Sequence, residues 1–590
     1  MAASEKVKTF NELFKQRLNR QHVLSLSACA HCGMCNDSCH YFLADGDPKM
    51  TPAAKADRIR SVYKGFYDWI GKFVPFWVGA RKIQTDGDLE ELKDVFFGSC
   101  TGCRRCTLNC PFGVDMAAIV GLTRSCLVDV GVAPEGVLTV MKDQWETGNQ
   151  MAITPEDYIE TLEWLEEETQ MELDDPDFKV PIDKEGADFV YVINPREIKY
   201  APLSLQAAFK IFHVAGLDWT MGSSGWDNTN FGLFSGKPDL GGHMSNLAYN
   251  HAKKLGVKRL VVSECGHGLR STKWEGPNWG KANPLPFEII SILELMVDLI
   301  NSGKIILDPH KNTDPVTYHD PCNLSRSGGM TEEPRFCLKR ACIDFREMTP
   351  NRSDSYCCTG GGGAMSMSEY SKRRLSVSKM KAEQIERTEA ASVATACHNC
   401  VDGLTDVIKH NDLKYDFGNG KPKLLPVKNV CEYVADAIVI PKELPERKPR
   451  VREKVRQGKI LVVDDQPDVV TYLEALLQDT GYDVVTAFDG AEGIQTAKDE
   501  QPDLITLDVT MPGKSGVSVF NELRSTPGVD KIPVFIVTGD IDFRQLMYQR
   551  TVEAPEGFMQ KPINEDVFLM TVDRLLETSR HERELTHEPS

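Results

Sequence analysis

Short apolar runs alternate with stretches of helical periodicity over most of this chain. Between residues 186 and 445 the apolar runs are FVYVI, RLVVS, VTYHD and SVATA, and between residues 459 and 580 they are KILVV, YDVVTA, LITLD, IPVFIV and GFMQ. β-rich runs separated by helices predict sheets covered by helical layers. The five evenly spaced runs of the second segment predict a separate, doubly wound (βα)5 domain.

The remaining segments divide the chain further into an α/β multidomain protein. Residues 1–185 show helical patterns without strand candidates, so we expect an α-helical domain. The body splits into halves at 186–304 and 305–445. Residues 446–458 are Pro-rich and basic and predict a linker, residues 459–580 form the (βα)5 domain, and residues 581–590 predict a disordered tail.

The two halves of the body carry a short, diverged internal repeat. FVYVINPR (189–196) resembles PVTYHDPC (315–322), and VVSECGHG (261–268) resembles SVATACHNC (392–400). This pairing sets Arg196 against Cys322, Cys265 against Cys397 and Gly268 against Cys400. We therefore expect residues 186–304 to be a degenerate copy of residues 305–445.

Composition narrows the class of protein. The chain has 590 residues, 41% hydrophobic and 26% charged, with a formal net charge of −18, which is globular composition and argues against nucleic acid as a partner. The chain has no uninterrupted stretch of about 18 apolar residues, so the sequence predicts no transmembrane helix. The charged N-terminus lacks the apolar core of a signal peptide, so we expect a cytoplasmic protein.

Cysteine is the most informative residue type, with 18 in the chain, of which 13 fall into three patterns. The first two patterns have the spacing C-x2-C-x2-C-x3-C. In this spacing three thiolates bind one [4Fe-4S] cubane and the fourth reaches the other cubane. The predicted ligand sets are Cys29, Cys32, Cys35 and Cys110 for one cluster and Cys100, Cys103, Cys106 and Cys39 for the second. Structural zinc is the alternative, but it favours separated CxxC pairs.

An aromatic insertion, YKGFYDWIGKFVPFWVGA (63–80), lies between the two runs. Exposed aromatic patches mark interaction surfaces, so one interpretation is a docking surface for a membrane subunit. The other is an ordinary aromatic core helix.

The third pattern combines Cys322, Cys357-Cys358 followed by Thr-Gly-Gly-Gly-Gly, and Cys397-His-Asn-Cys400. Five cysteines exceed the needs of one cubane, and glycines let the backbone approach closely. No Gly-Lys-Ser/Thr follows, so the glycine run is not a phosphate loop.

This arrangement resembles the CCG domain of the heterodisulfide-reductase catalytic subunit family. The ferredoxin runs before it are similar to those of the fused subunits in membrane redox complexes of sulfate- and sulfur-metabolising microbes, in particular the K subunit of the Dsr membrane complex. The resemblance covers about residues 20–440. It implies a non-cubane [4Fe-4S] cluster bound by Cys322, Cys357, Cys358, Cys397 and Cys400.

The same resemblance implies an activity and partners. Electrons from a quinol-oxidising cytochrome b-type subunit would split a disulfide or trisulfide on a DsrC-like sulfur-carrier protein, at the cytoplasmic face of the membrane. The first half departs from the two-cluster pattern, because only Cys265 remains there, which argues against a second non-cubane cluster.

Several residues near these ligands stay open between two interpretations. Cys265 is either a substrate-side thiol, with His267 as proton donor, or a relict buried cysteine. His319 and His398 either donate hydrogen bonds to ligand sulfurs or are structural. Cysteines outside the patterns, namely Cys126, Cys337, Cys342 and Cys431, are expected to be core thiols.

In the C-terminal domain, polar residues follow the predicted strands. Asp464 and Asp465 follow the first, Asp508 the third, Thr538 the fourth and Lys561 the fifth. This set resembles the response-regulator receiver family, in which the carboxylates bind Mg²⁺, an aspartate (here Asp508) accepts a phosphoryl group, and Thr538 and Lys561 complete the site. It implies a sensor histidine kinase as partner; the alternative is a receiver kept only as a docking module.

Three functions remain for the whole chain. The first is a sulfur-reducing subunit of a quinol-linked membrane complex, regulated by phosphorylation. The second is an electron relay for a flavoprotein dehydrogenase with no sulfur substrate, and the third is a redox sensor.

Overall fold

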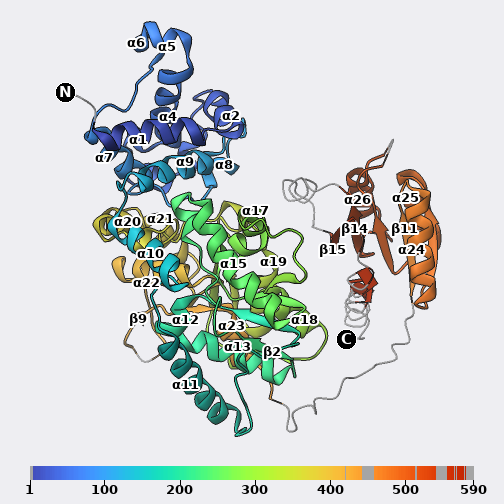
Figure 1. Ribbon diagram of the computed structural model, residues 1–590. Helices are drawn as coiled ribbons and strands as arrows, with labels where there is room; N and C mark the ends of the chain where they lie inside the picture. The colour runs from blue at the N-terminus through green and yellow to red at the C-terminus, as the bar shows by residue number, and fades with distance from the viewer. Residues whose placement is uncertain are drawn as a thin grey trace. The chain divides into compact units, whose positions relative to one another are not determined.

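The computed structural model describes residues 4–418, 420–440, 458–511, 514–539 and 555–561, together with scattered residues from 563 to 579. The chain divides into two compact units, Met1–Glu446 and Arg447–Ser590, drawn in Figure 1. The predicted tail, and the predicted linker apart from Gly458, lie outside the described residues.

The N-terminal part of the first unit is helical, as predicted. Its long helices are α1 (Glu5–Arg17), α2 (Arg20–Ala28), α4 (Pro52–Tyr67), α7 (Asp86–Phe96), α9 (Met116–Asp129), α10 (Glu135–Thr147) and α11 (Pro155–Leu173). Phe10, Phe14, Ile59 and Phe96 are buried in a core that α9 crosses. Short helices α3 (His40–Asp45) and α8 (Arg105–Leu108) adjoin the two cysteine runs, and α5 (Trp69–Phe73) and α6 (Pro75–Val78) form the aromatic insertion.

The body contains two four-stranded parallel sheets. The first is built from β1 (Phe189–Val192), β2 (Trp219–Met221), β3 (Arg259–Val262) and β4 (Glu288–Ser291), in the order β2-β1-β3-β4. The second is built from β5 (Val316–His319), β6 (Phe345–Glu347), β7 (Ser392–Thr395) and β10 (Val427–Asn429), in the order β10-β7-β5-β6. Each sheet is parallel throughout and has the first strand of its half at an inner position, next to the third. The shared parallel architecture supports the internal repeat.

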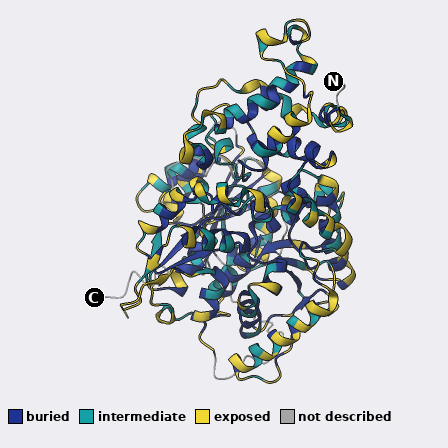
Figure 2. Ribbon diagram, turned by 90° about the vertical axis from the view of Figure 1, so that its left-hand side faces the viewer, coloured by how far each residue is buried: buried dark blue, intermediate teal, exposed yellow. Residues whose placement is uncertain are grey.

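Helices cover these sheets and join them into one body. They include α12 (Pro195–Lys199), α13 (Pro202–Val214), α14 (Phe231–Ser235), α15 (Pro238–Leu255), α16 (Gly266–Leu269), α17 (Gly276–Trp279) and α18 (Ile292–Asn301) in the first half, and α19 (Glu332–Ala341), α20 (Ser371–Ser376), α21 (Lys379–Glu386), α22 (His398–His410) and α23 (Val430–Ala437) in the second. A single apolar core contains strands of both halves and reaches Val430 and Val434 on α23. Figure 2 shows the strands as buried and the exposed residues on the outer helices.

The second unit is a five-stranded parallel sheet in the order β12-β11-β13-β14-β15. The strands are β11 (Lys459–Val463), β12 (Asp483–Ala487), β13 (Leu504–Leu507), β14 (Val534–Thr538) and β15 (Gly557–Gln560), and the helices α24 (Pro467–Asp479), α25 (Gly490–Glu500) and α26 (Gly516–Ser525). Separate apolar clusters lie on the two faces of the sheet. This is the predicted doubly wound fold.

The structure also tests two expectations from composition. Among the described residues, none of the helices is both long and apolar enough to cross a bilayer. The four cysteines outside the patterns, Cys126, Cys337, Cys342 and Cys431, are all buried in apolar cores, as expected.

Candidate functional site

The two ferredoxin runs form two separate cavities. The lining of one includes Cys29, Cys32, Cys35 and Cys110, and that of the other Cys39, Cys100, Cys103 and Cys106; Cys106 borders both cavities. Each cavity therefore contains the first three cysteines of one run together with the last cysteine of the other. Lys55, buried on α4, donates to Cys39 Sγ at 3.7 Å and to the Ser99 carbonyl. Four thiols around one cavity fit the ligand demand of a cubane.

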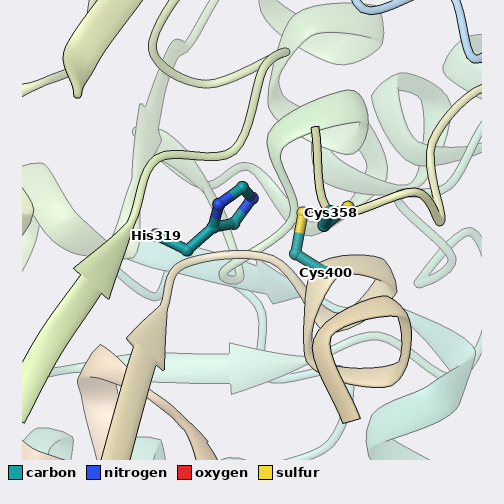
Figure 3. Close-up of side chains that lie close together, drawn as sticks. All are labelled: His319, Cys358 and Cys400. Atoms are coloured by element: carbon teal, nitrogen blue, oxygen red, sulfur yellow. Dashed lines mark hydrogen bonds between the residues drawn. The ribbon is translucent and has the colours of Figure 1, made fainter. Parts of the chain in front are cut away.

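The CCG cysteines meet at the carboxyl ends of the second sheet. Cys358 lies in the loop before the glycine run and Cys400 on α22, and their sulfurs are 3.3 Å apart. His319, the last residue of β5, faces both of them (Figure 3). Both ring nitrogens of His319 are buried and make no hydrogen bond to the described residues, and burial lowers the pKa of this histidine.

Cys322 differs from the other four cysteines of this set in exposure. Cys357, Cys358, Cys397 and Cys400 are buried, whereas Cys322 is partly exposed. Burial of its sulfur nevertheless raises the pKa of the Cys322 thiol to about 12. A free thiol with this pKa is protonated at neutral pH, and bound iron would be needed to hold it as a thiolate.

The CCG loop packs directly on the second ferredoxin run. Thr101 Oγ1 lies 3.4 Å from Cys357 Sγ, and the neighbouring Cys357 thiol lowers the pKa of Cys103. Gly362 has φ +64°, and a Cβ there would lie 2.4 Å from the Thr101 carbonyl oxygen. The glycine run therefore permits the close backbone approach that the sequence predicted.

Two arginines hold this contact. Arg124 of α9 is fully buried and donates to the carbonyls of Phe96, Cys100, Phe234 and Gly362, at 2.7–2.9 Å. Arg326 donates to the carbonyls of Cys103, Ser353 and Ser355. A guanidinium presents five donors in a rigid plane, so one side chain can fix several segments at once. Neither arginine stands out in the sequence.

The first half brings Cys265 to the same site. Cys265 precedes α16 as its N-cap, as Cys397 precedes α22, and the nearby Cys397 thiol adds to burial in raising the pKa of Cys265. His267 Nδ1 lies 3.3 Å and Asn194 Nδ2 3.4 Å from Cys265 Sγ. The structure thus brings Cys265 to the CCG cysteines and His267 to Cys265.

In the first half, other residue types occupy the positions that correspond to the remaining cysteines of the second half. Asp227 and Asn228 lie between β2 and β3 before Thr229, as Cys357 and Cys358 lie between β6 and β7 before Thr359. A Cβ at Gly268 would lie 2.6 Å from Asn228 Oδ1, so a cysteine there does not fit. Arg196, the counterpart of Cys322, pairs with Asp402 of the second half.

Two buried carboxylates near the site, Glu197 and Glu264, were not predicted from the sequence. Glu197 accepts from Ser263 Oγ at 2.6 Å and pairs with His398 at 3.3 Å. Burial lowers the pKa of His398, but the carboxylates around it outweigh burial and the net shift is upward. Glu264 accepts the first amides of α23, from Val430 and Cys431, and burial raises its pKa to about 8. The sequence feature that could have pointed to a buried carboxylate was Glu264, which directly precedes Cys265.

A buried ion pair supports the loop that carries Cys322. Asp320 forms a bidentate, fully buried ion pair with Arg335, with both distances 2.8 Å, and Arg335 also binds Glu347. Lys381 is buried within electrostatic range of Cys358 and Asp320, and burial lowers its pKa to about 8.

In the second unit, the predicted acidic site assembles at the carboxyl ends of the strands. Oxygens of Asp464, Asp465 and Asp508 lie within 4.8 Å of one another. Lys561 Nζ lies 2.7 Å from both Asp464 and Asp508, and its amide donates to the Thr538 carbonyl. Burial raises the pKa of Asp464. One oxygen of Asp465 is buried without a partner among the described residues, which suits an oxygen-binding cation.

Fold and site together define an iron–sulfur redox protein fused to a receiver domain. Family models match at residues 25–114 (4Fe-4S dicluster domain), 316–404 (Cysteine-rich domain) and 460–573 (Response regulator receiver domain). The iron-sulfur subunit 2 of the Hdr-like menaquinol oxidoreductase of Archaeoglobus fulgidus is 31% identical over 403 residues, which cover 60% of this chain and 71% of that protein. The chain belongs to this family of Hdr-like iron–sulfur subunits.

Two further relatives extend the comparison. One subunit of the dihydromethanophenazine:CoB–CoM heterodisulfide reductase of Methanosarcina barkeri is 27% identical, over 72% of this chain and 96% of its own length. Protein PilH of Pseudomonas aeruginosa is 31% identical over 119 residues, which are 20% of this chain and 98% of PilH. The predicted Hdr-like body and receiver are thereby confirmed.

Proposed function

We propose that this chain is the sulfur-reducing subunit of a quinol-linked membrane complex, acting on a disulfide or trisulfide of a DsrC-like carrier protein. The observation that carries the proposal is the contact of Cys357, of the CCG set, with Thr101, of the second ferredoxin run, at 3.4 Å. It joins the second ferredoxin run to the CCG site without an intervening layer of protein. Electrons delivered to the ferredoxin part thus have a short route to the place where sulfur would bind.

The proposed ligands follow the grouping of the cysteines. The first cubane takes Cys29, Cys32, Cys35 and Cys110, the second Cys39, Cys100, Cys103 and Cys106, and the non-cubane cluster Cys322, Cys357, Cys358, Cys397 and Cys400. When bound, such clusters supply one-electron carriers and an iron site for sulfur. The protein supplies the rest: Arg124 and Arg326 fix the loop, and Cys265 with His267 places a thiol and an imidazole beside Cys397.

A membrane cytochrome b-type partner is proposed from the aromatic insertion. Trp69, Phe73, Phe76 and Trp77 are 72–81% exposed, so the alternative of an aromatic core helix is wrong for these four residues. A patch of this kind needs a partner. Such docking would place the chain at the cytoplasmic face of the membrane.

Regulation by a sensor histidine kinase is proposed from the receiver site. Asp508 would accept the phosphoryl group, Asp464 and Asp465 with Asp508 would hold Mg²⁺, and Lys561 would neutralise charge on the phosphoryl oxygens. In the test, acetyl phosphate labels the wild-type chain and leaves Asp508→Asn unlabelled; persistent labelling would identify another acceptor.

The main test measures thiols released from a trisulfide-bearing carrier by the cluster-loaded chain under anaerobic reduction. The proposal predicts release in proportion to electrons supplied. Clusters that are reduced normally while no thiol appears, together with a flavoprotein that accepts their electrons, would establish the electron-relay alternative instead.

A further inference from the structure

A cleft of about 640 Å³ lies in the first unit, between α2, α9, the start of α15 and the region around α17. Its size is that of a small-molecule or peptide-tail site. Thr101, Gly362 and Asn323 are among the residues that line it. Thr101 contacts Cys357, and Asn323 follows Cys322, the most exposed cysteine of its set. The cleft therefore reaches residues that adjoin the CCG site.

The lining of this cleft is basic, in a chain of net charge −18. Five cations line it (Arg17, Arg104, Arg124, Lys237 and Arg270), against three carboxylates (Asp115, Asp239 and Glu275). Arg124 is occupied by four carbonyls, and Arg17 and Lys237 are both paired with Asp129. Arg104 and Arg270 are paired with carboxylates that themselves line the cleft, Asp115 and Glu275, and a ligand carboxylate would compete with these two for the guanidiniums.

These two arginines lie beside the proposed cysteine ligands. Arg104 directly follows Cys103, and Arg270 contacts Asn323, which directly follows Cys322. Arg104 meets its carboxylate, Asp115, only at 3.7 Å, and its Nε is buried without a hydrogen bond to any described residue. Arg270 donates to Asn323 at 3.1 Å and to Glu275 at 2.8 Å. Two guanidiniums that line the same partly buried cleft favour the binding of an anion there.

We infer that this cleft binds the anionic end of the sulfur substrate, a thiol or disulfide bearing a carboxylate, and that Arg104 and Arg270 hold that carboxylate beside Cys322. The inference rests on the proposed function, of which it names the substrate class. Lysine would not replace either residue fully, because only a guanidinium can present two parallel N–H groups to a carboxylate.

The test uses the full chain with its clusters loaded and two thiols that differ only in charge, 3-mercaptopropionate and 3-mercaptopropionamide. Anaerobic calorimetric titration is expected to show the carboxylate binding at least tenfold more tightly, with an affinity that falls as salt rises. Arg104→Gln and Arg270→Gln should each remove most of that preference. Arg387→Gln, an exposed arginine of the second half paired with Glu383, is the matched control and should leave it unchanged.

A further variant is expected to bind mercaptopropionate more tightly, and a gain in affinity is not explained by misfolding. Glu275→Gln removes the carboxylate that competes for Arg270 and should tighten mercaptopropionate binding several-fold. Equal affinity for the two thiols, or a preference that survives both arginine substitutions, would overturn the inference. Cluster EPR spectra of the same samples separate the two proposals: charge-selective binding that leaves every cluster signal unchanged would refute sulfur chemistry at the CCG site while leaving the cleft intact.

A final arm identifies the source of the carboxylate. A tetrapeptide ending in cysteine with a free C-terminus is compared with mercaptopropionate and with its own amide. Tighter binding of the free-acid peptide indicates the tail of a carrier protein, whereas a peptide weaker than mercaptopropionate indicates a small molecule.

Discussion

The two halves of the body share a parallel sheet architecture but not a chemistry. In the second half, Cys358 touches Cys400 across the end of the sheet. In the first half the corresponding contact is between Asn228 and Gly268, where no second cysteine fits. Cys265 alone is retained, and it lies against Cys397 rather than in a site of its own. The first half therefore contributes residues to the edge of the second half's site and does not form a cluster site of its own.

The polar groups of the first half are consistent with this change of role. Asp227 accepts from the amides of Gln150 and Thr229, and Asn228 donates to the Val192 carbonyl and to Ser263. These hydrogen bonds pair most of the buried polar atoms that occupy the place of ligand thiols, and an unpaired buried polar group is costly. The Oδ1 of Asn228 has no partner among the described residues. Arg196 ties the first half to Asp402 of the second.

The largest expected effect comes from removing the paired cysteines of the second half. Cys357→Ala with Cys358→Ala should lower bound iron from about twelve to about eight per chain, with both cubane signals retained, and sulfur reduction should fall to background. The matched control is Asp227→Asn with Asn228→Ala in the first half, which should keep all the iron. Equal loss of iron in the two double variants would contradict the division between the halves.

Cys265 tests whether the first half contributes chemistry. Cys265→Ser should keep all bound iron but slow thiol release at least about tenfold, which corresponds to roughly 1.4 kcal/mol of transition-state stabilisation. Cys397→Ser, its counterpart, should lose cluster iron as well. Unchanged turnover in Cys265→Ser would make this residue a relict.

The glycine run tests the contact between the ferredoxin part and the second half. Gly362→Ala places a Cβ against the Thr101 carbonyl, whereas Gly303→Ala in the first half meets open space at a similar positive φ of +65°. Both variants should lose about 1–2 kcal/mol from the left-handed backbone conformation. Only Gly362→Ala should also slow electron transfer to the CCG site, measured by rapid-freeze EPR. Equal rates in both variants would mean that the contact does not carry the electrons.

The smallest expected effect is on the pH dependence of stability, and it concerns a residue of the first half alone. Burial raises the pKa of Asp227 from 3.8 to about 7, so the folded state binds a proton that the unfolded state has released. The free energy of unfolding contributed by this group therefore falls as pH rises from about 4 to about 7 and is level above it. Asp227→Asn should remove that fall, visible as a melting temperature that drops less between pH 5 and pH 8 than in the wild type. Identical pH profiles would show that Asp227 is ionised throughout.

Much of the fold was predictable because its signals are local. The strand runs, the repeat and the receiver motifs each depend on a few consecutive residues, and the structure and comparisons confirm the fold class. The ligand assignments stay predictions, although the lining of each ferredoxin cavity includes the four cysteines that the spacing predicts for it, with Cys106 bordering both.

What the sequence did not show depends on long-range packing. Arg124 binds four carbonyls from three segments of the chain, and Arg335 joins Asp320 to Glu347. A single arginine in an otherwise ordinary helix gives no periodic signal. The role of Asp227 and Asn228 was missed for a related reason, since their likeness to Cys357 and Cys358 is one of position in the fold rather than of residue type.

The most direct test of the central claim is an anaerobic, redox-titrated EPR spectrum recorded with and without a thiol-bearing sulfur-carrier protein. We predict a new signal from an oxidised cluster that requires the carrier's cysteines, disappears in the Cys357/Cys358 double variant and survives in the Asp227/Asn228 control. Reduced-cubane signals alone, unchanged by the carrier, would contradict sulfur chemistry at the CCG site and leave the chain as an electron relay.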